Sequence, residues 1–290
     1  MPVNDELGKR MKEYYEGIPK TKLMRRTPVA IRIDGKAFHT FTKGFEKPFD
    51  EVLIKSMQET MKYLCENIQG CVLGYTQSDE ITLILVDYKN LDSSAWFDYE
   101  VQKMCSIAAS MATMAFNKAF SKAFDEWGRE NLPDWYEGGT NEPVDKDLMK
   151  LCEAYDNAER RGAMFDARVF NIPKEEVTNL IYWRQLDATR NSIQMVGQAN
   201  FSHKKLQNKS CNMIQDMLMT EKGINWNDFP AYQKRGSCCI KEEYYPKPAL
   251  GCEDCDVDAS SIRTRWVIDK EIPIFKNEDR NYIERLINFE

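Results

Sequence analysis

Several features that would assign a function class directly are missing from the sequence. The 290 residues include only two histidines, too few to argue for a Ser-His-Asp arrangement. No G-x-x-x-x-G-K-S/T motif occurs, which excludes a P-loop enzyme. The apolar runs are too short to cross a membrane, and the first residues lack the apolar region of a signal peptide. We therefore expect a cytoplasmic protein without a membrane partner.

The chain also lacks an excess of positive charge. Its formal net charge is −6, whereas a protein that only coats nucleic acid is usually basic, so RNA would have to bind through local patches. Nine cysteines, an odd number, in a chain with no export signal favour reduced thiols over a disulfide framework. Hydrophobic residues make up 42% of the chain, which is enough for a sizeable core.

The hydrophobic patterns predict an α+β fold. In chain order, the expected elements are a strand (28–35), an aromatic-rich loop (38–50), a helix (51–67), a hairpin (71–86), a long helix (97–127), a polar insertion with a short helix (128–160), a strand (162–173) and a helix (174–197). Asp50 is expected to cap the helix that follows it. This order is the split βαβ, ferredoxin-like pattern, which polymerase palms share. We therefore predict a palm-like antiparallel sheet with packed helices.

The small residues of 105–120 let helices approach closely, so we expect this stretch to be buried, either in the core or at a subunit interface. We divide the chain into a palm-type catalytic domain with a helical C-terminal part (1–235) and a C-terminal extension (236–290). The extension carries a C-x-x-C motif, Cys252 and Cys255, preceded by Cys238 and Cys239. Four thiols at such spacing can bind Zn²⁺, and the alternative is four unpaired cysteines.

Two acidic motifs end neighbouring strands of this predicted sheet. Asp34 closes the strand I-R-I-D-G, and Asp79 lies in the hairpin segment T-Q-S-D-E. Adjacent carboxylates repel each other, and a pair of Mg²⁺ ions would explain why they meet. Two such ions, roughly 4 Å apart, activate an attacking oxygen and neutralise a leaving pyrophosphate. Each motif alone is also an ordinary turn signal. Glu80 either contacts a metal, directly or through water, or begins the outward face of its strand.

These motifs belong to a longer ordered set. The segments are I-R-I-D-G-K-A-F-H-T-F, K-P-F-D, G-Y-T-Q-S-D-E, F-D-A-R-V-F, W-R-Q-L-D-A-T-R-N, F-S-H-K-K-L, G-I-N-W-N-D-F-P-A-Y-Q-K-R-G and R-W-V-I-D. Together they resemble the tRNA-histidine guanylyltransferase family, and most closely its guanylyltransferase-like branch. The resemblance covers residues from about 5 to about 240, with a remnant near 262–275.

The resemblance implies a nucleotidyltransferase that extends tRNA at its 5′ end, in the 3′–5′ direction. ATP or GTP first activates a 5′-monophosphate, and the 3′-hydroxyl of an incoming NTP then attacks the activated phosphate. A 5′-triphosphate end can skip the activation. The resemblance also implies two Mg²⁺ ions, NTP substrates, a tRNA partner and a homotetramer.

The family's site residues fall on particular positions of this sequence. Asp34, the Gly35 carbonyl and Asp79 match metal ligands, and Glu80 belongs to the same acidic motif. Seven positions match residues around the nucleotide and its triphosphate: Arg32, Lys36, Ala37, Phe38, His39, Lys47 and Ser78. Seven others match the RNA- or phosphate-binding set: Asp187, Asn191, His203, Lys204, Lys205, Lys234 and Arg235. Structural alternatives are that His39 stabilises its loop, that His203 orients a helix start, and that the basic residues form a solvated face.

One departure separates this chain from enzymes that add guanosine to tRNA-histidine. Those enzymes carry a histidine two residues after the acid of W-R-Q-x-D, where Thr189 stands here. The departure favours template-dependent repair of truncated tRNA 5′ ends over guanosine addition to tRNA-histidine. Two further readings stay open: a palm-type nucleotidyl cyclase, which needs no RNA surface, and a non-catalytic RNA-binding protein with a degenerate palm.

Overall fold

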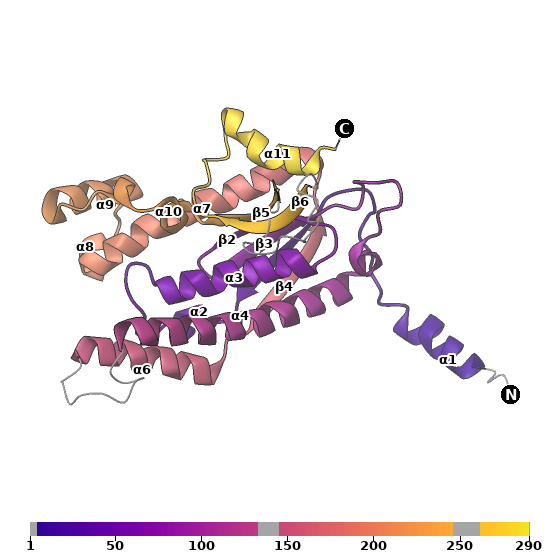
Figure 1. Cartoon of the computed structure of the whole chain (residues 1–290), viewed down its shortest axis with the longest axis horizontal. Coiled ribbons are helices and arrows are strands. Elements are labelled where there is room, and N and C mark those ends of the chain that lie inside the picture. Colours follow the sequence, from indigo (N-terminus) through magenta and orange to yellow (C-terminus); the bar gives the residue numbers. More distant parts are fainter. Residues whose placement is uncertain (1–4, 133–144, 246–261, 290) are drawn as a thin grey trace, which may run out of the picture.

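The computed structural model describes residues 5–132, 145–245 and 262–289, which build one six-stranded sheet with helices on both faces (Figure 1). The strands are β1 (Val29–Gly35), β2 (Cys71–Gln77), β3 (Glu80–Leu85), β4 (Phe165–Asn171), β5 (Ser237–Tyr244) and β6 (Arg263–Asp269). They lie in the order β4-β1-β3-β2-β5-β6, and every neighbouring pair is antiparallel. The first four strands reproduce the split βαβ order, so the predicted fold class is confirmed.

The helices divide between the two faces of the sheet. Their bounds are α1 (Glu6–Met11), α2 (Phe38–Phe41), α3 (Glu51–Asn67), α4 (Val101–Asn131), α6 (Lys146–Arg161), α7 (Lys174–Asn200), α8 (His203–Leu206), α9 (Cys211–Met217), α10 (Ala231–Arg235) and α11 (Asn281–Ile287). Helices α3 and α4 cover one face, and α7 and α11 cover the other (Figure 1). None of the described helices is long and apolar enough to cross a membrane.

The alternation of side chains along β1 explains this division. Ile31 and Ile33 are fully buried in the core beneath α3 and α4, whereas Ala30 packs in a second cluster beneath α7 and α11. Helix α3 begins as expected, because the Asp50 carboxylate accepts a hydrogen bond from the Leu53 N–H at 2.9 Å. The Tyr155 hydroxyl of α6 donates to the same carboxylate at 2.7 Å, so one buried acid caps α3 and anchors α6.

Three local expectations need correction. Helix α4 begins at Val101 rather than residue 97, because positive φ angles at Phe97, Asp98 and Tyr99 form a turn before it. The helix within the insertion is longer than expected: α6 has 16 residues, and its apolar side chains pack on α4. The stretch 105–120 is only half buried, since its small residues line one face while Ser106, Ser110 and Met114 are exposed.

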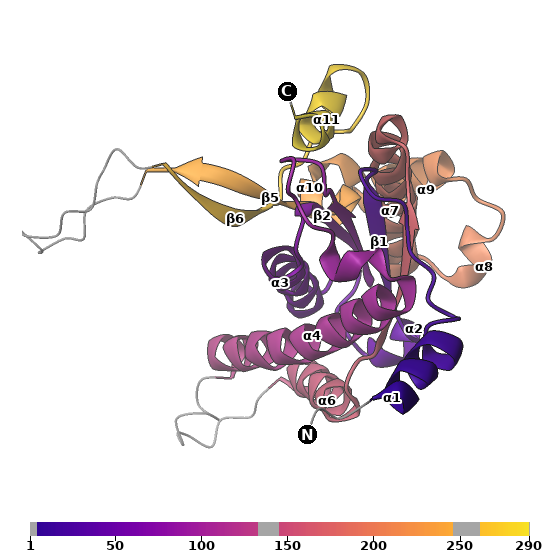
Figure 2. The same cartoon turned by 90° about the vertical axis from the view of Figure 1, so that its right-hand side faces the viewer.

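The C-terminal segment extends the palm sheet. Strand β5 pairs with β2, with Cys239 opposite Gly74, and β6 pairs with β5. Gly74 allows α3 to pack closely on the sheet at this point, because a Cβ at residue 74 would lie 2.5 Å from the Cys65 sulfur of α3. The far ends of β5 and β6 project from the body as a two-stranded ribbon (Figure 2). The predicted boundary at 235/236 thus falls between α10 and a strand of the same sheet.

Candidate active site

The sheet brings the two predicted acidic motifs to one edge. Strand β1 pairs with β3 so that Asp34 lies opposite Glu80. The turn between β2 and β3 is tight, with Ser78 at φ +50°, and the Gly35 N–H donates to the Asp79 carbonyl at 3.1 Å. On the other side of β1, Asp166 of β4 lies opposite Asp34. Residues far apart in the sequence therefore form one acidic cluster at the strand ends.

The electrostatics of this cluster favour a bound cation. Burial raises the pKa of the Asp79 carboxyl, and the charges of Asp34 and Glu80 raise it further, against a lowering hydrogen bond from Ser78. Burial also raises the pKa of Asp34, with further contributions from Glu80 and Asp166. A positive ion placed between these carboxylates would offset both their burial and their mutual repulsion.

The donor set of the cluster suits Mg²⁺. Asp34 and Asp79 offer carboxylate oxygens and Gly35 offers a backbone carbonyl, and Mg²⁺ completes such a set with phosphate oxygens and water. Among residues 5–132, 145–245 and 262–289, no group of three or more His, Cys, Asp or Glu side chains is placed to hold a metal ion.

Glu80 is already paired on both sides. Its Oε1 accepts a hydrogen bond from Arg32 at 3.0 Å, and its Oε2 accepts one from Arg184 of α7. Arg184 is only 3% exposed and also bonds Asp187 at 3.0 Å. A direct metal contact by Glu80 would therefore require an arginine pair to break, and the side chain instead ties β3 to α7.

A pocket of about 530 Å³ opens beside Asp79. It is lined by Gly35, Ala37, Phe38, His39, Thr42, Phe45, Glu46, Lys47, Pro48, Asp50, Leu53, Ser78, Asp79 and Met195. Seven of these were expected at the metal and nucleotide positions. His39 and Lys47 are exposed and bring basic groups to the pocket, whereas Phe38 is buried and supports its floor. Arg32 and Lys36 are not among the lining residues.

The predicted RNA- or phosphate-binding residues fall into two groups, one near the pocket beside Asp79 and one on α8. Asn191 lines a smaller cavity of about 80 Å³, which shares Ser78 and Met195 with the first pocket and reaches α10. Lys234 and Arg235 belong to α10, where the Arg235 carbonyl accepts a hydrogen bond from Tyr75 at 2.7 Å. Asp187 is not free, since it also pairs with Arg190.

His203, Lys204 and Lys205 lie elsewhere. They form the exposed helix α8, beyond the C-terminal end of α7. Met195 is the α7 residue in the pocket, and the end of α7 at Asn200 lies about 8 Å further along the helix, before α8 begins. Helix α8, which carries them, follows the C-terminal end of α7 (Figure 1), and Lys205 pairs there with Glu221.

The cysteines expected to bind zinc do not come together in the described part of the chain. Cys238 and Cys239 are neighbours on β5 and point to opposite faces, one into each hydrophobic cluster. A single ion bound by both would require this strand to be distorted. Cys252 and Cys255 lie outside the described residues.

Sequence reasoning missed Arg184 and Trp183. Both lie within the segment W-R-Q-L-D-A-T-R-N, from which only Asp187 and Asn191 were selected as site residues. A signal was present, because Arg184 shares the helical spacing of the buried residues Ile181 and Ala188. A charged residue on an apolar face needs a buried partner, and Glu80 is that partner.

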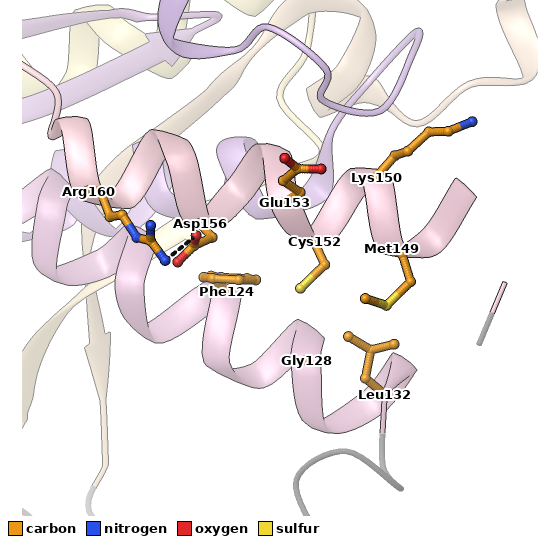
Figure 3. A pocket seen from close by; sticks show the side chains of 9 residues that line it. All are labelled: Phe124, Gly128, Leu132, Met149, Lys150, Cys152, Glu153, Asp156 and Arg160. Carbon is orange, nitrogen blue, oxygen red and sulfur yellow. Dashed lines mark ion pairs between the residues drawn. The ribbon is translucent and has the colours of Figure 1, made fainter. Parts of the chain in front are cut away.

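Another pocket lies between α4 and α6 (Figure 3). Its volume is about 610 Å³, and Phe124, Leu132, Met149 and Cys152 give it an apolar lining. Asp156 and Arg160 form an ion pair at its rim, 2.8 Å apart. None of the predicted site residues lines it, and the two acids among its lining residues are Glu153 and Asp156, so it differs in character from the pocket beside Asp79.

Comparisons with known proteins agree with this geometry. Residues 8–173 match the model of the family described as tRNAHis guanylyltransferase, Thg1. A bacterial Thg1-like protein solved in complex with ATP is 42% identical, covers 98% of this chain and 100% of its own, and superposes with a TM-score of 0.73. One solved in complex with GTP is 37% identical, covers 98% and 99%, and gives 0.70. The tRNA(His) guanylyltransferase of Saccharomyces cerevisiae is 27% identical over 74% of this chain and 82% of its own. The predicted family is confirmed: the chain belongs to the tRNAHis guanylyltransferase family, whose members are nucleotidyltransferases.

Proposed function

We propose that this protein is a metal-dependent nucleotidyltransferase that adds nucleotides to the 5′ end of tRNA in the 3′–5′ direction. The observation that carries the proposal is that Asp79 lines the same pocket as His39 and Lys47, while Asp34 is close enough for its charge to raise the pKa of Asp79. The pocket volume of about 530 Å³ lies within the usual size range of small-molecule sites. Bacterial relatives of similar structure bind ATP and GTP.

The chain's own residues would divide the work as follows. Lys47 and His39 would orient the triphosphate, and the Ser78 hydroxyl would accept or donate one further hydrogen bond near it. Asp34, the Gly35 carbonyl and Asp79 would hold Mg²⁺, which when bound activates the attacking oxygen and neutralises the leaving group. In the first reaction an oxygen of the tRNA 5′-phosphate bonds to the α-phosphorus of ATP or GTP, and pyrophosphate leaves. In the second, the 3′-hydroxyl of an NTP attacks the activated 5′-phosphorus, and the nucleoside monophosphate leaves.

Template-dependent repair is the role we favour within this activity. Thr189 stands where guanosine-adding enzymes have a histidine, and its hydroxyl donates to the Gln185 carbonyl of its own helix at 2.9 Å. It therefore offers no free donor for reading an RNA base. Guanosine addition to tRNA-histidine is the second candidate, because curated relatives carry that name. The homotetramer, the two-part domain division and the cytoplasmic location stay predictions.

The test uses a tRNA that lacks its first nucleotide and carries a labelled 5′-monophosphate. It is incubated with the protein, Mg²⁺ and all four NTPs, and Asp34→Ala and Asp79→Ala serve as inactive variants. Asp125→Asn, an exposed acid on α4, is the matched control. Extension that follows the Watson–Crick partner, and that disappears only in the two site variants, is the expected result. No extension, even of a 5′-triphosphate end, would overturn the proposal and point to cyclase chemistry on NTP alone.

A further inference from the structure

Trp183 is exposed although the next two residues of α7 are buried. Its exposed fraction is 52%, while Arg184 and Gln185 are 3% and 2% exposed. The Arg184 guanidinium carbon lies 4.7 Å from the centre of the indole ring, and that of Arg32 lies 5.7 Å from it. Two guanidinium groups thus hold the ring in place while much of its surface faces water.

The ring adjoins the acidic cluster through short contacts. Arg32 contacts Trp183 and donates to Glu80, and Glu80 lies opposite Asp34 in the sheet. Arg168 of β4 lies opposite Arg32 in the sheet. The Arg168 side chain is 68% exposed, so a third guanidinium group faces water next to Arg32. The acids near these arginines are Glu80, paired with Arg32 and Arg184, and Asp187, paired with Arg184. Asp166 lies 3.9 Å from Arg168, and the charges of Arg32 and Arg168 both act on Asp34.

Trp183 and the pocket beside Asp79 occupy different positions along α7. Met195 lines that pocket and Trp183 does not. Twelve residues separate the two, which corresponds to about 18 Å of helix. Arg184 and Asp187, which contact Glu80 and each other, lie between them. The acidic cluster is therefore approached from the pocket on one side and from Trp183 on the other.

The proposed reaction joins two nucleotides, and the pocket of about 530 Å³ beside Asp79 is the site assigned to one of them. We propose that Trp183, flanked by Arg32 and Arg168, is the stacking surface for the base of the second nucleotide. This inference rests on the proposed function. A flat indole suits an enzyme that adds any of four nucleotides, because every base has a π-face and stacking does not depend on base identity. The exposed guanidinium of Arg168 would meet the phosphate of the same nucleotide.

The second base can come from the RNA end or from the incoming NTP, and a fluorescent base distinguishes them. One arm uses tRNA with 2-aminopurine at a 5′-hydroxyl end, which has no phosphate to activate. The other uses 2-aminopurine riboside triphosphate without RNA. Both contain the protein and Mg²⁺. Stacking on indole quenches 2-aminopurine, so we expect the wild-type protein to quench it in at least one arm.

Two variants remove the flat ring: Trp183→Ala, and Trp183→Leu, which keeps an apolar side chain there. Both should lose the quenching. In the extension reaction, KM should rise by about 5- to 150-fold with kcat less affected. The affected KM is that of the 5′-phosphorylated tRNA if the RNA arm was quenched, and that of the NTP if the triphosphate arm was quenched. Leu186→Ala, which truncates another exposed apolar residue one turn away (49% exposed), should behave as wild type. Thermal unfolding confirms that each variant is folded.

Unchanged quenching and KM in the folded Trp183 variants would overturn the inference, as would a wild-type protein that quenches in neither arm. Failure of the proposed function would look different, because the wild-type protein would then not extend the 5′-phosphorylated tRNA at all.

Discussion

Both faces of the palm sheet carry an apolar cluster, but near the strand ends they carry opposite kinds of side chain. Beneath α3 and α4 the face is a dense apolar cluster, in which Phe41 packs against Phe38, Phe45, Phe116 and Phe120 with ring centres 5.1–5.8 Å apart. Beneath α7, near the strand ends, the same strands carry Arg32, Asp34 and Glu80. The buried Arg184 of α7 donates a hydrogen bond to Glu80. The strands therefore provide stability through the apolar clusters of both faces and chemistry through the charged strand ends on the α7 face. Changes on the two faces should separate activity from folding.

The largest expected effect is a loss of activity without a loss of stability. Asp79→Asn keeps the size of the side chain but removes half of the carboxylate pair. We expect a loss of about 10⁴-fold in the rate of transfer, roughly 5.5 kcal/mol of barrier, because metal ions supply several kcal/mol at such sites. The unfolding midpoint without Mg²⁺ should not fall, since a repulsive charge is removed. Single-turnover extension and thermal unfolding measure the two quantities. A variant that keeps its rate would show that Asp79 is not a ligand.

The opposite change acts on the apolar face. Phe41 is 4% exposed, and Phe41→Ala should lower the free energy of unfolding by about 4 kcal/mol through lost burial and a new cavity. Met114→Ala, on the exposed face of α4, should cost much less. Urea denaturation measures both. Equal losses in the two variants would mean that the aromatic cluster is less tightly packed than its ring contacts indicate.

A third change tests the link between the faces. Arg184→Lys keeps the charge but not the fork that reaches Glu80 and Asp187, and it should cost about 2 kcal/mol of stability, as a lost hydrogen bond between charged groups does. Arg190→Lys is the matched control, because Arg190 also pairs with Asp187 but its side chain is 60% exposed. Exposed pairs contribute little, so its loss should stay below about 0.5 kcal/mol. Similar losses in both variants would argue against a special role for the buried arginine.

The same contrast explains what the sequence could and could not predict. Strand alternation and helical spacing were sufficient for the order of the first four strands and for the meeting of Asp34 and Asp79, because both follow from local periodicity and topology. Strands β5 and β6 were not predicted, because their place in the sheet depends on the pairing of β5 with β2. Helix α6 was underestimated, because its length depends on packing against α4. The partners of Glu80 were missed for a similar reason. Arg184 is distant in sequence, and only the docking of α7 onto the sheet brings it to the strand end.

The smallest expected effect lies at the other end of the α7 face. Burial raises the pKa of Tyr88 to about 12, and its hydroxyl donates to the Ile287 carbonyl of α11 at 3.0 Å. A tyrosine whose folded pKa exceeds the unfolded value near 10 stabilises the fold fully below pH 10, and that contribution is lost as pH rises toward 12. Tyr88→Phe should therefore be somewhat less stable at neutral pH and should lose less stability between pH 9 and 11. Urea midpoints across that range provide the measurement. Parallel pH profiles for the two proteins would show that Tyr88 keeps its proton no more firmly when folded than when unfolded, and that the contact with α11 contributes packing alone.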